Sequence, residues 1–101
     1  CYVDSRARIG KGTKIAYGGA GVVIHPSATI GANCLIAPGV IIGGRSGQHA
    51  PVIEDEVEIF SNAAVLGSIT VGKNSIIGSN VVLTESVEPN SIWVSQKPRR
   101  L

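Results

Sequence analysis

The residues that decide the fold are 52–83, which read VIEDEVEIFSNAAVLGSITVGKNSIIGSNVVL. Every sixth residue of this stretch is aliphatic, in the series Ile53, Ile59, Val65, Val71, Ile77 and Leu83. A period of six matches neither the helical period of about 3.6 nor the simple alternation of an ordinary strand. The stretch therefore predicts short strands joined by corners, with one aliphatic side chain of each strand pointing inward.

The same step of six continues on the N-terminal side in two further blocks. The aliphatic positions of these blocks are Val3, Ile9 and Ile15, and then Ile24, Ile30, Ile36 and Ile42. Residues two places earlier are mostly small or β-branched, and glycine often follows the aliphatic residue, as at Gly31 and Gly72. A unit of this kind cannot bury its apolar side alone, so the blocks predict a solenoid whose stacked coils share one aliphatic column.

The composition supports a single all-β domain that spans residues 1–101. The chain is 44% hydrophobic, yet only four residues are aromatic, while 13 are Ile and 12 are Val. β-Branched residues fit a pleated surface and lose rotamer freedom in a helix. Because the repeats cover about 3–88, we expect residues 89–101 to form a short irregular tail.

The same composition argues against several partners. A net charge of +2 and few aromatic residues argue against binding of nucleic acid. No apolar run approaches the roughly 20 residues that a membrane-spanning helix needs. Two cysteines cannot build a disulfide framework and no signal peptide is visible, so we expect a cytoplasmic protein. A chain that begins at Cys1 and contains no Met is expected to be part of a longer one.

The pattern of an aliphatic residue, glycine and four variable residues resembles the repeat of the hexapeptide-repeat acyltransferases. The resemblance covers about residues 3–88 and implies a left-handed parallel β-helix, a triangular prism with three repeats in each coil. The step of six is broken between Ile15 and Ile24 and between Ile42 and Ile53, and we expect two loop insertions outside the prism there. Loops on a rigid scaffold are where function tends to lie.

Within this superfamily the chain resembles serine acetyltransferases and polysaccharide O-acetyltransferases. The resemblance rests on GVIIGG at 39–44, on His49-Ala50-Pro51, and on AVLGSITVG at 64–72. It implies transfer of an acetyl group from acetyl-CoA, as co-substrate, to a hydroxyl or amino group of a small acceptor such as an amino acid or a sugar. It also implies a homotrimer with its active site between neighbouring prisms, and no metal. The alternative is a catalytically inactive module that serves trimerisation or structure.

The resemblance also places residues that bind coenzyme A. These residues are Gly43, Gly44, Ser61, Ser79, Lys97 and Arg99. The two glycines let the acyl group approach the backbone, or are only turn glycines. The two serines line the coenzyme groove, or are solvated strand residues. The two basic residues lie where the family binds the nucleotide end, or belong to a solvated charged tail.

The catalytic candidates are His49 and Tyr17. Transfer to an alcohol needs a base for the hydroxyl proton, and His titrates nearest to neutral pH. Serine acetyltransferases carry their principal catalytic His in the first loop, where this chain has Gly18, with Tyr17 at the position of the preceding Asp. His49, in the second loop, therefore acts as the base, with Tyr17 as the next candidate, or the site is inactive and His49 is a surface residue without a role.

His25 lies in an Ile-His-Pro-Ser-Ala sequence that is frequent at corners of this family, and we interpret it as structural.

Two other functions of the same fold do not suit the sequence. A trimeric carbonic anhydrase needs three His ligands for each metal, and this chain has two His. An ice-binding solenoid needs ladders of outward Thr, and this chain has only four Thr.

Overall fold

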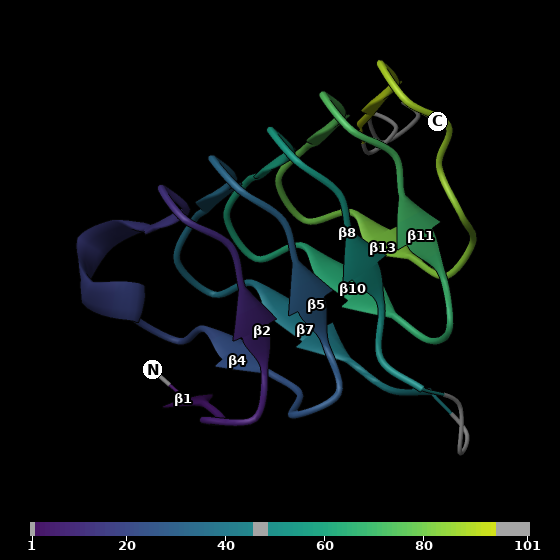
Figure 1. Ribbon diagram of the computed structural model, residues 1–101. Helices are drawn as coiled ribbons and strands as arrows, with labels where there is room; N and C mark the ends of the chain where they lie inside the picture. The colour runs from purple at the N-terminus through teal and green to yellow at the C-terminus, as the bar shows by residue number, and fades with distance from the viewer. Residues whose placement is uncertain (1, 46–48, 95–101) are drawn as a thin grey trace, which may run out of the picture.

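The chain winds into coils whose short strands stack in three parallel sheets, and Figure 1 shows the coils in chain order from one end of a prism to the other. The structure is a computed structural model that describes residues 2–45 and 49–94. All strand pairs within these ranges are parallel. The predicted left-handed parallel β-helix is confirmed.

Each full coil contributes one strand to each sheet. Sheet A contains β1 (Tyr2–Val3), β4 (Val23–Ile24), β7 (Ile41–Gly43), β10 (Ala64–Leu66) and β13 (Val82–Leu83). Sheet B contains β2 (Arg8–Ile9), β5 (Thr29–Ile30), β8 (Val52–Ile53) and β11 (Thr70–Val71). Sheet C contains β3 (Lys14–Ile15), β6 (Leu35–Ile36), β9 (Glu58–Ile59), β12 (Ile76–Ile77) and β14 (Ile92–Trp93). We call the edges where the chain passes from one sheet to the next corner AB, corner BC and corner CA.

The register of the sheets shows how much each insertion adds. Where no loop intervenes, paired residues of neighbouring coils are 18 positions apart, as are Ala64 and Val82. The last coil is shorter by two residues, since Ile76 pairs with Ile92 and Val71 with Val87. The offset is 21 across the first insertion, from Tyr2 to Val23, and 23 across the second, from Ile41 to Ala64. Both predicted insertions are therefore present, and they add three and five residues without moving the inward side chains out of phase.

The predicted inward residues form the core. The aliphatic positions of the six-residue step from Ile24 to Leu83 are all at most 2% exposed. Each such side chain stabilises the fold by about 1.5–3 kcal/mol through burial. Ser75, two places before an inward residue, is also buried, and its hydroxyl donates to the Glu88 carbonyl at 3.1 Å. Ile9 is 37% exposed, because in the described part of the chain its coil packs against a neighbour on one side only.

Two corners are built on stacked residues with left-handed backbone. These are Gly12, Asn33, Glu56, Asn74 and Asn90 at corner BC, and Gly21, Gly39, Asn62 and Asn80 at corner CA. On every coil after the first, the backbone N–H of this residue donates to a carbonyl of the preceding coil, as that of Asn62 does to the Pro38 carbonyl at 3.0 Å. Asn tolerates this conformation better than most residues with a side chain, which explains its place in the repeat. Corner AB is built differently, since Gly67 alone among its described residues has a positive φ.

Residues 84–94 close the C-terminal end of the prism. Val87 forms a parallel bridge with Val71, and the partly buried Trp93 packs against the core. Within the tail predicted as irregular, Ile92–Trp93 form β14, because they pair with the exposed edge of β12. The backbone of this closing segment passes so near Gly72 that an added Cβ there would lie 2.3 Å from the Pro89 nitrogen.

Replacing Gly72 by Ala is expected to lower the free energy of unfolding by about 1–3 kcal/mol, because the methyl group collides with the backbone of the closing segment. Gly43→Ala is the matched control. The nearest atom to its added Cβ is Leu66 Cδ2 at 3.7 Å, and its φ lies outside the left-handed region. We expect it to change the free energy of unfolding by less than about 0.5 kcal/mol. Urea unfolding followed by Trp93 fluorescence measures both, and equal losses in the two variants would contradict this packing.

Candidate functional site

The two insertions leave the prism at different corners. The first contains the short turn η1 (Ala16–Gly19), in which Tyr17 and Gly18 have left-handed backbone, and lies at corner CA, between β3 and β4. The second lies at corner AB, between β7 and β8. Figure 1 shows η1 and the strands that flank the second loop on different edges of the prism.

Corner AB brings together residues that are far apart in the sequence. Asp4, His25 and Gly43 each follow or end a strand of sheet A, and the register pairs β1 with β4 and β4 with β7. The backbone N–H of His25 donates to the Ile42 carbonyl at 2.8 Å. Neighbouring strands lie about 4.8 Å apart, so His25 stands one coil from Gly43, and Asp4 stands two coils from it.

The two ends of the second insertion lie beside the turn formed by His25–Ala28. It begins at Gly43 and returns to β8 through Pro51, whose carbonyl accepts a hydrogen bond from the Thr29 N–H at 3.2 Å. His49 lies in this loop and is exposed. Both ends of the loop are therefore fixed to the coil that contains this turn.

Room for a Cβ distinguishes Gly43 from the other glycines of the repeat for which packing can be compared. At Gly31 an added Cβ would lie 2.3 Å from Asp55 Oδ1, whereas at Gly43 it would make only ordinary contacts. Packing therefore explains Gly31 but not Gly43. A residue without a side chain at an open corner allows a ligand to approach the backbone closely, which the predicted acyl site requires.

A fixed guanidinium group lies at the same corner on the first coil. Arg6 Nε donates to Asp4 Oδ1 at 2.9 Å, and Arg6 Nη2 donates to Asp4 Oδ2 at 3.0 Å. The backbone N–H of Arg6 also donates to Asp4 Oδ1 at 2.9 Å. The side-chain hydrogen bonds from Arg6, followed by this backbone bond, lower the pKa of Asp4 from its ordinary 3.8 to about 2. Asp4 therefore stays ionised and holds Arg6 in one orientation.

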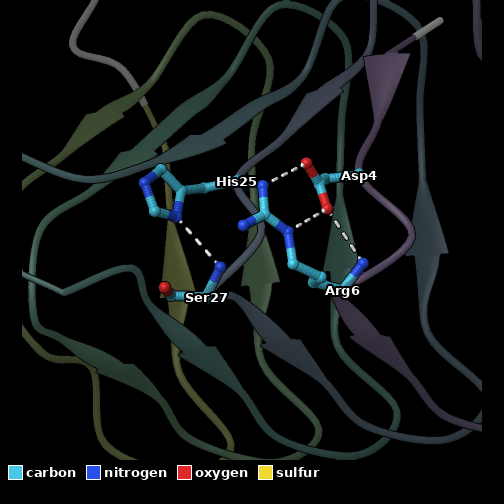
Figure 2. A network of polar contacts seen from close by, with 4 residues as sticks. All are labelled: Asp4, Arg6, His25 and Ser27. Atoms are coloured by element: carbon cyan, nitrogen blue, oxygen red, sulfur yellow. Dashed lines mark hydrogen bonds and ion pairs between the residues drawn. The ribbon is translucent and has the colours of Figure 1, made fainter.

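His25 has the same local arrangement one coil further on. Its Nδ1 accepts a hydrogen bond from the backbone N–H of Ser27 at 3.0 Å, as the carboxylate of Asp4 does from Arg6. In the neutral ring the proton must then be on Nε2, which makes Nε2 a hydrogen-bond donor. Figure 2 shows the guanidinium group of Arg6 between the Asp4 carboxylate and the His25 ring in this view.

Tyr17, Ser61 and Ser79 all lie along corner CA, Tyr17 on the first coil and the two serines on the third and fourth coils. Tyr17 is 87% exposed and has a φ of 52°, in the left-handed region. A bulky residue in this conformation costs about 1–3 kcal/mol, and such strain is often found at functional positions. Ser61 is half-buried and Ser79 is exposed, and they stand on successive coils. The carbonyl of Ser61 accepts a hydrogen bond from the Asn80 N–H at 3.0 Å.

The predicted site residues thus form two groups, one on each side of sheet A. Gly43, Gly44 and His49 lie at corner AB, and Tyr17, Ser61 and Ser79 lie at corner CA. One prism does not bring the two groups together. Lys97 and Arg99 lie outside the described residues.

Other surfaces of the described ranges hold none of these residues. A hollow of about 460 Å³ on sheet C is lined by Asn33, Leu35, Glu56, Glu58, Asn74 and Ile76. Within residues 2–45 and 49–94, no group of three or more His, Cys, Asp or Glu side chains is placed to hold a metal ion. The same residues contain no helix that is long and apolar enough to span a membrane.

No site role was predicted for the polar residues on the N-terminal side of Gly43. His25 was interpreted as a structural corner residue, yet it lies 18 positions before Gly43, which is one coil. That spacing was a usable signal. The bond between Asp4 and Arg6 had no comparable signal, because it depends on side-chain geometry within one turn.

Comparison with known proteins agrees with the fold. Residues 50–85 match a family model described as bacterial transferase hexapeptide, with six repeats. This chain belongs to the hexapeptide-repeat superfamily. Curated relatives of this hexapeptide-repeat protein include a serine acetyltransferase of Synechococcus elongatus, 39% identical over 98 residues, and one of Staphylococcus aureus, 44% identical over 91 residues. These alignments cover 94% and 87% of this chain but 39% and 42% of the relatives, so the chain spans about two fifths of their length.

Solved structures give the same result. A crystal structure of Entamoeba histolytica serine acetyltransferase isoform 3 in complex with cysteine matches with a TM-score of 0.85 at 36% identity, over 94% of this chain and 35% of that one. A Neisseria gonorrhoeae serine acetyltransferase in complex with serine also matches with a TM-score of 0.85 at 36% identity, over 92% of this chain and 39% of that one.

Replacing Arg6 by Gln is expected to raise the pKa of Asp4 from about 2 most of the way to 3.8, because the side-chain hydrogen bonds are its largest cause. A folded-state pKa below the ordinary value means that the charged carboxylate stabilises the fold above about pH 4, and that this stabilisation is lost as the pH falls towards 2. A carboxyl ¹³C titration by NMR measures the midpoint. Arg8→Gln, on the same coil, should leave it near 2, and an unchanged midpoint in Arg6→Gln would contradict the assignment.

Proposed function

We propose that this hexapeptide-repeat protein is a cytoplasmic enzyme that transfers an acetyl group from acetyl-CoA to the hydroxyl group of serine or a similar small acceptor. The observation that carries the proposal is corner AB, where the open backbone at Gly43 lies at the base of the loop that contains His49. Relatives named serine acetyltransferase, and structures of such enzymes with serine or cysteine bound, support this class of acceptor.

The chemistry assigned to this corner needs one base and an open approach to the thioester. The acceptor oxygen attacks the thioester carbonyl while His49 removes the hydroxyl proton. The new C–O bond forms, the C–S bond breaks, and the protonated imidazole returns its proton to the departing sulfur of coenzyme A. Gly43 and Gly44 leave room for the acyl group beside the backbone, and Ser61, Ser79, Lys97 and Arg99 contact the coenzyme.

Association of three copies would complete the site. The outward residues of sheet A are Tyr2, Val23, Ile41, Ala64 and Val82, which pair in one ladder along the whole sheet. All five are apolar or aromatic, and Tyr2 and Val82 are 61% and 67% exposed. The outer faces of the other two sheets each include a charged residue, Arg8 on sheet B and Lys14 on sheet C. Sheet A is therefore the face best suited to be buried against copies of the chain.

A threefold axis in front of sheet A pairs unlike corners. Sheet A is bounded by corner AB on one side and corner CA on the other. When three prisms point this sheet at a common axis, corner AB of each copy lies beside corner CA of the next, because cyclic contacts are heterologous. His49 of one copy then faces the corner that contains Tyr17, Ser61 and Ser79 in its neighbour. The proposed homotrimer thus explains why the predicted residues are divided between two corners.

Replacing His49 by Ala is expected to lower the rate of thiol release from acetyl-CoA in the presence of serine by about 10²–10⁴-fold, because the acceptor loses its base. Acetyl-CoA should still raise the melting temperature of the variant as it does that of the parent, because a ligand that binds the native state stabilises it. Turnover within a factor of two of the parent would exclude His49 as the base and make Tyr17 the next candidate. A parent that acetyl-CoA does not stabilise would instead indicate an inactive structural module.

A further inference from the structure

We infer that the outer face of sheet C pairs with the same face of a second copy of the chain. In this pairing the two prisms are antiparallel, and a twofold axis lies along the strands at Leu35. Lys14 of each copy then enters the hollow on sheet C of the other copy, beside Glu58. The pairing involves neither sheet A nor the insertions, so it is independent of the proposed function and of the proposed trimer.

Opposite charges are separated along the prism. Residues 6–14, on the first coil, include four basic residues and no acidic one. Residues 54–58, on the third coil, include four acidic residues and no basic one. Two copies that run in opposite directions bring the basic coil of one beside the acidic coil of the other. A surface that is complementary to itself in this way forms a closed pair.

The outward residues of sheet C decide where the axis lies. In order along the prism these residues are Lys14, Leu35, Glu58, Ile76 and Ile92. Because Lys14 and Glu58 each lie one coil from Leu35, an axis at Leu35 places each lysine opposite a glutamate and Leu35 opposite its own copy. An axis at Glu58 places two carboxylates opposite one another, and like charges repel. Among these five residues, only the axis at Leu35 pairs opposite charges and also pairs two apolar residues.

The hollow on sheet C lies where the lysine of the second copy arrives. It is centred on the coil of Glu58, because its lining is Asn33, Leu35, Glu56, Glu58, Asn74 and Ile76. A lysine packs its aliphatic stem on apolar side chains and keeps its ammonium group near polar atoms. Leu35 and Ile76 offer the apolar surface, and Glu56 and Glu58 offer the carboxylates. Packed sheets lie about 10 Å apart, a distance that a lysine and a glutamate side chain span together.

Glu56 has a backbone conformation that Glu adopts less readily than Gly or Asn. Its φ is 61°, and the residues stacked at the same place on other described coils are Gly12, Asn33, Asn74 and Asn90. Gly and Asn enter the left-handed region more easily than a residue with a longer side chain. The turn itself therefore does not account for a glutamate here. A second carboxylate beside the hollow does account for it.

The pairing depends on ionic strength and on protein concentration. Ion pairs between exposed residues are individually weak, and salt screens them over a Debye length of about 10 Å at 0.1 M and about 3 Å at 1 M. We therefore expect the pairing in concentrated protein at the lower salt. Dilute protein should have the mass that sheet A alone determines.

The test uses Ile41→Asp, a change that opposes association through sheet A and leaves sheet C intact. Sedimentation at about 0.1 M salt should show this chain passing from one to two chain masses between micromolar and millimolar protein, and remaining at one at about 1 M salt. Adding Lys14→Glu or Glu58→Lys should raise the dimer Kd about tenfold or more, because like charges then face each other. Both changes together should restore the Kd to within about threefold of its starting value, because the opposite charges are exchanged.

Two further variants separate this pairing from effects of net charge and of folding. Arg8→Glu makes the same change of charge on the same coil, but on sheet B, and should alter the Kd less than about threefold. Glu56→Asn should weaken the dimer while leaving the melting temperature equal or higher, because Asn suits the left-handed backbone. A loss of folding would lower both.

Three results would overturn the pairing. The first is an Ile41→Asp chain that stays at one chain mass at 0.1 M salt, which would leave a basic partner of another kind as the occupant of the hollow. The second is a dimer that Lys14→Glu and Glu58→Lys do not weaken. The third is a combined variant that pairs no better than either single one. None of these results alters thiol release from acetyl-CoA by the parent, so failure of this inference is distinguishable from failure of the proposed function.

Discussion

In-register stacking of the coils is the constraint on which the rest of the structure depends. Each inward aliphatic residue must lie directly above the one a coil below, because the sheets pair parallel strands and the core is a single column. An insertion therefore has to leave and rejoin the prism at the same corner. The three residues added at corner CA and the five added at corner AB do so without moving any inward residue out of phase. Loops can vary in such a scaffold while their ends stay fixed.

The same stacking decides which polar side chains lie next to one another. Any two residues a coil apart become neighbours, so His25 stands beside Gly43, and Asp4 with Arg6 stands beside His25. Corners BC and CA are occupied by left-handed residues that the backbone requires. Corner AB is less constrained by the backbone, and a Cβ added at Gly43 there would make only ordinary contacts. Corner AB, where the backbone restricts the sequence least, carries His25, His49 and the hydrogen-bonded pair Asp4 and Arg6.

Most of the fold could be predicted from the six-residue period, because one inward residue in every six decides both the core and the breaks. The residues of the candidate site were predicted less completely. Counting coils would have placed His25 next to Gly43, but its corner sequence suggested a purely structural role. The left-handed backbone of Tyr17 and the hydrogen bonds between Arg6 and Asp4 depend on local geometry. The six-residue period of the sequence does not predict such geometry. The division of the site between two corners became visible only when the strands were assigned to sheets.

A site shared between copies is tested most directly by placing a charge in the middle of the apolar face of sheet A. Ile41 is 42% exposed there, so Ile41→Asp should leave the fold intact and oppose association. In sedimentation experiments we expect the parent at three times the mass of the chain and the variant at one, with thiol release from acetyl-CoA lost in the variant. A parent that sediments as a single chain, or a monomeric variant that releases thiol at the parent's rate, would contradict a site built between neighbouring prisms.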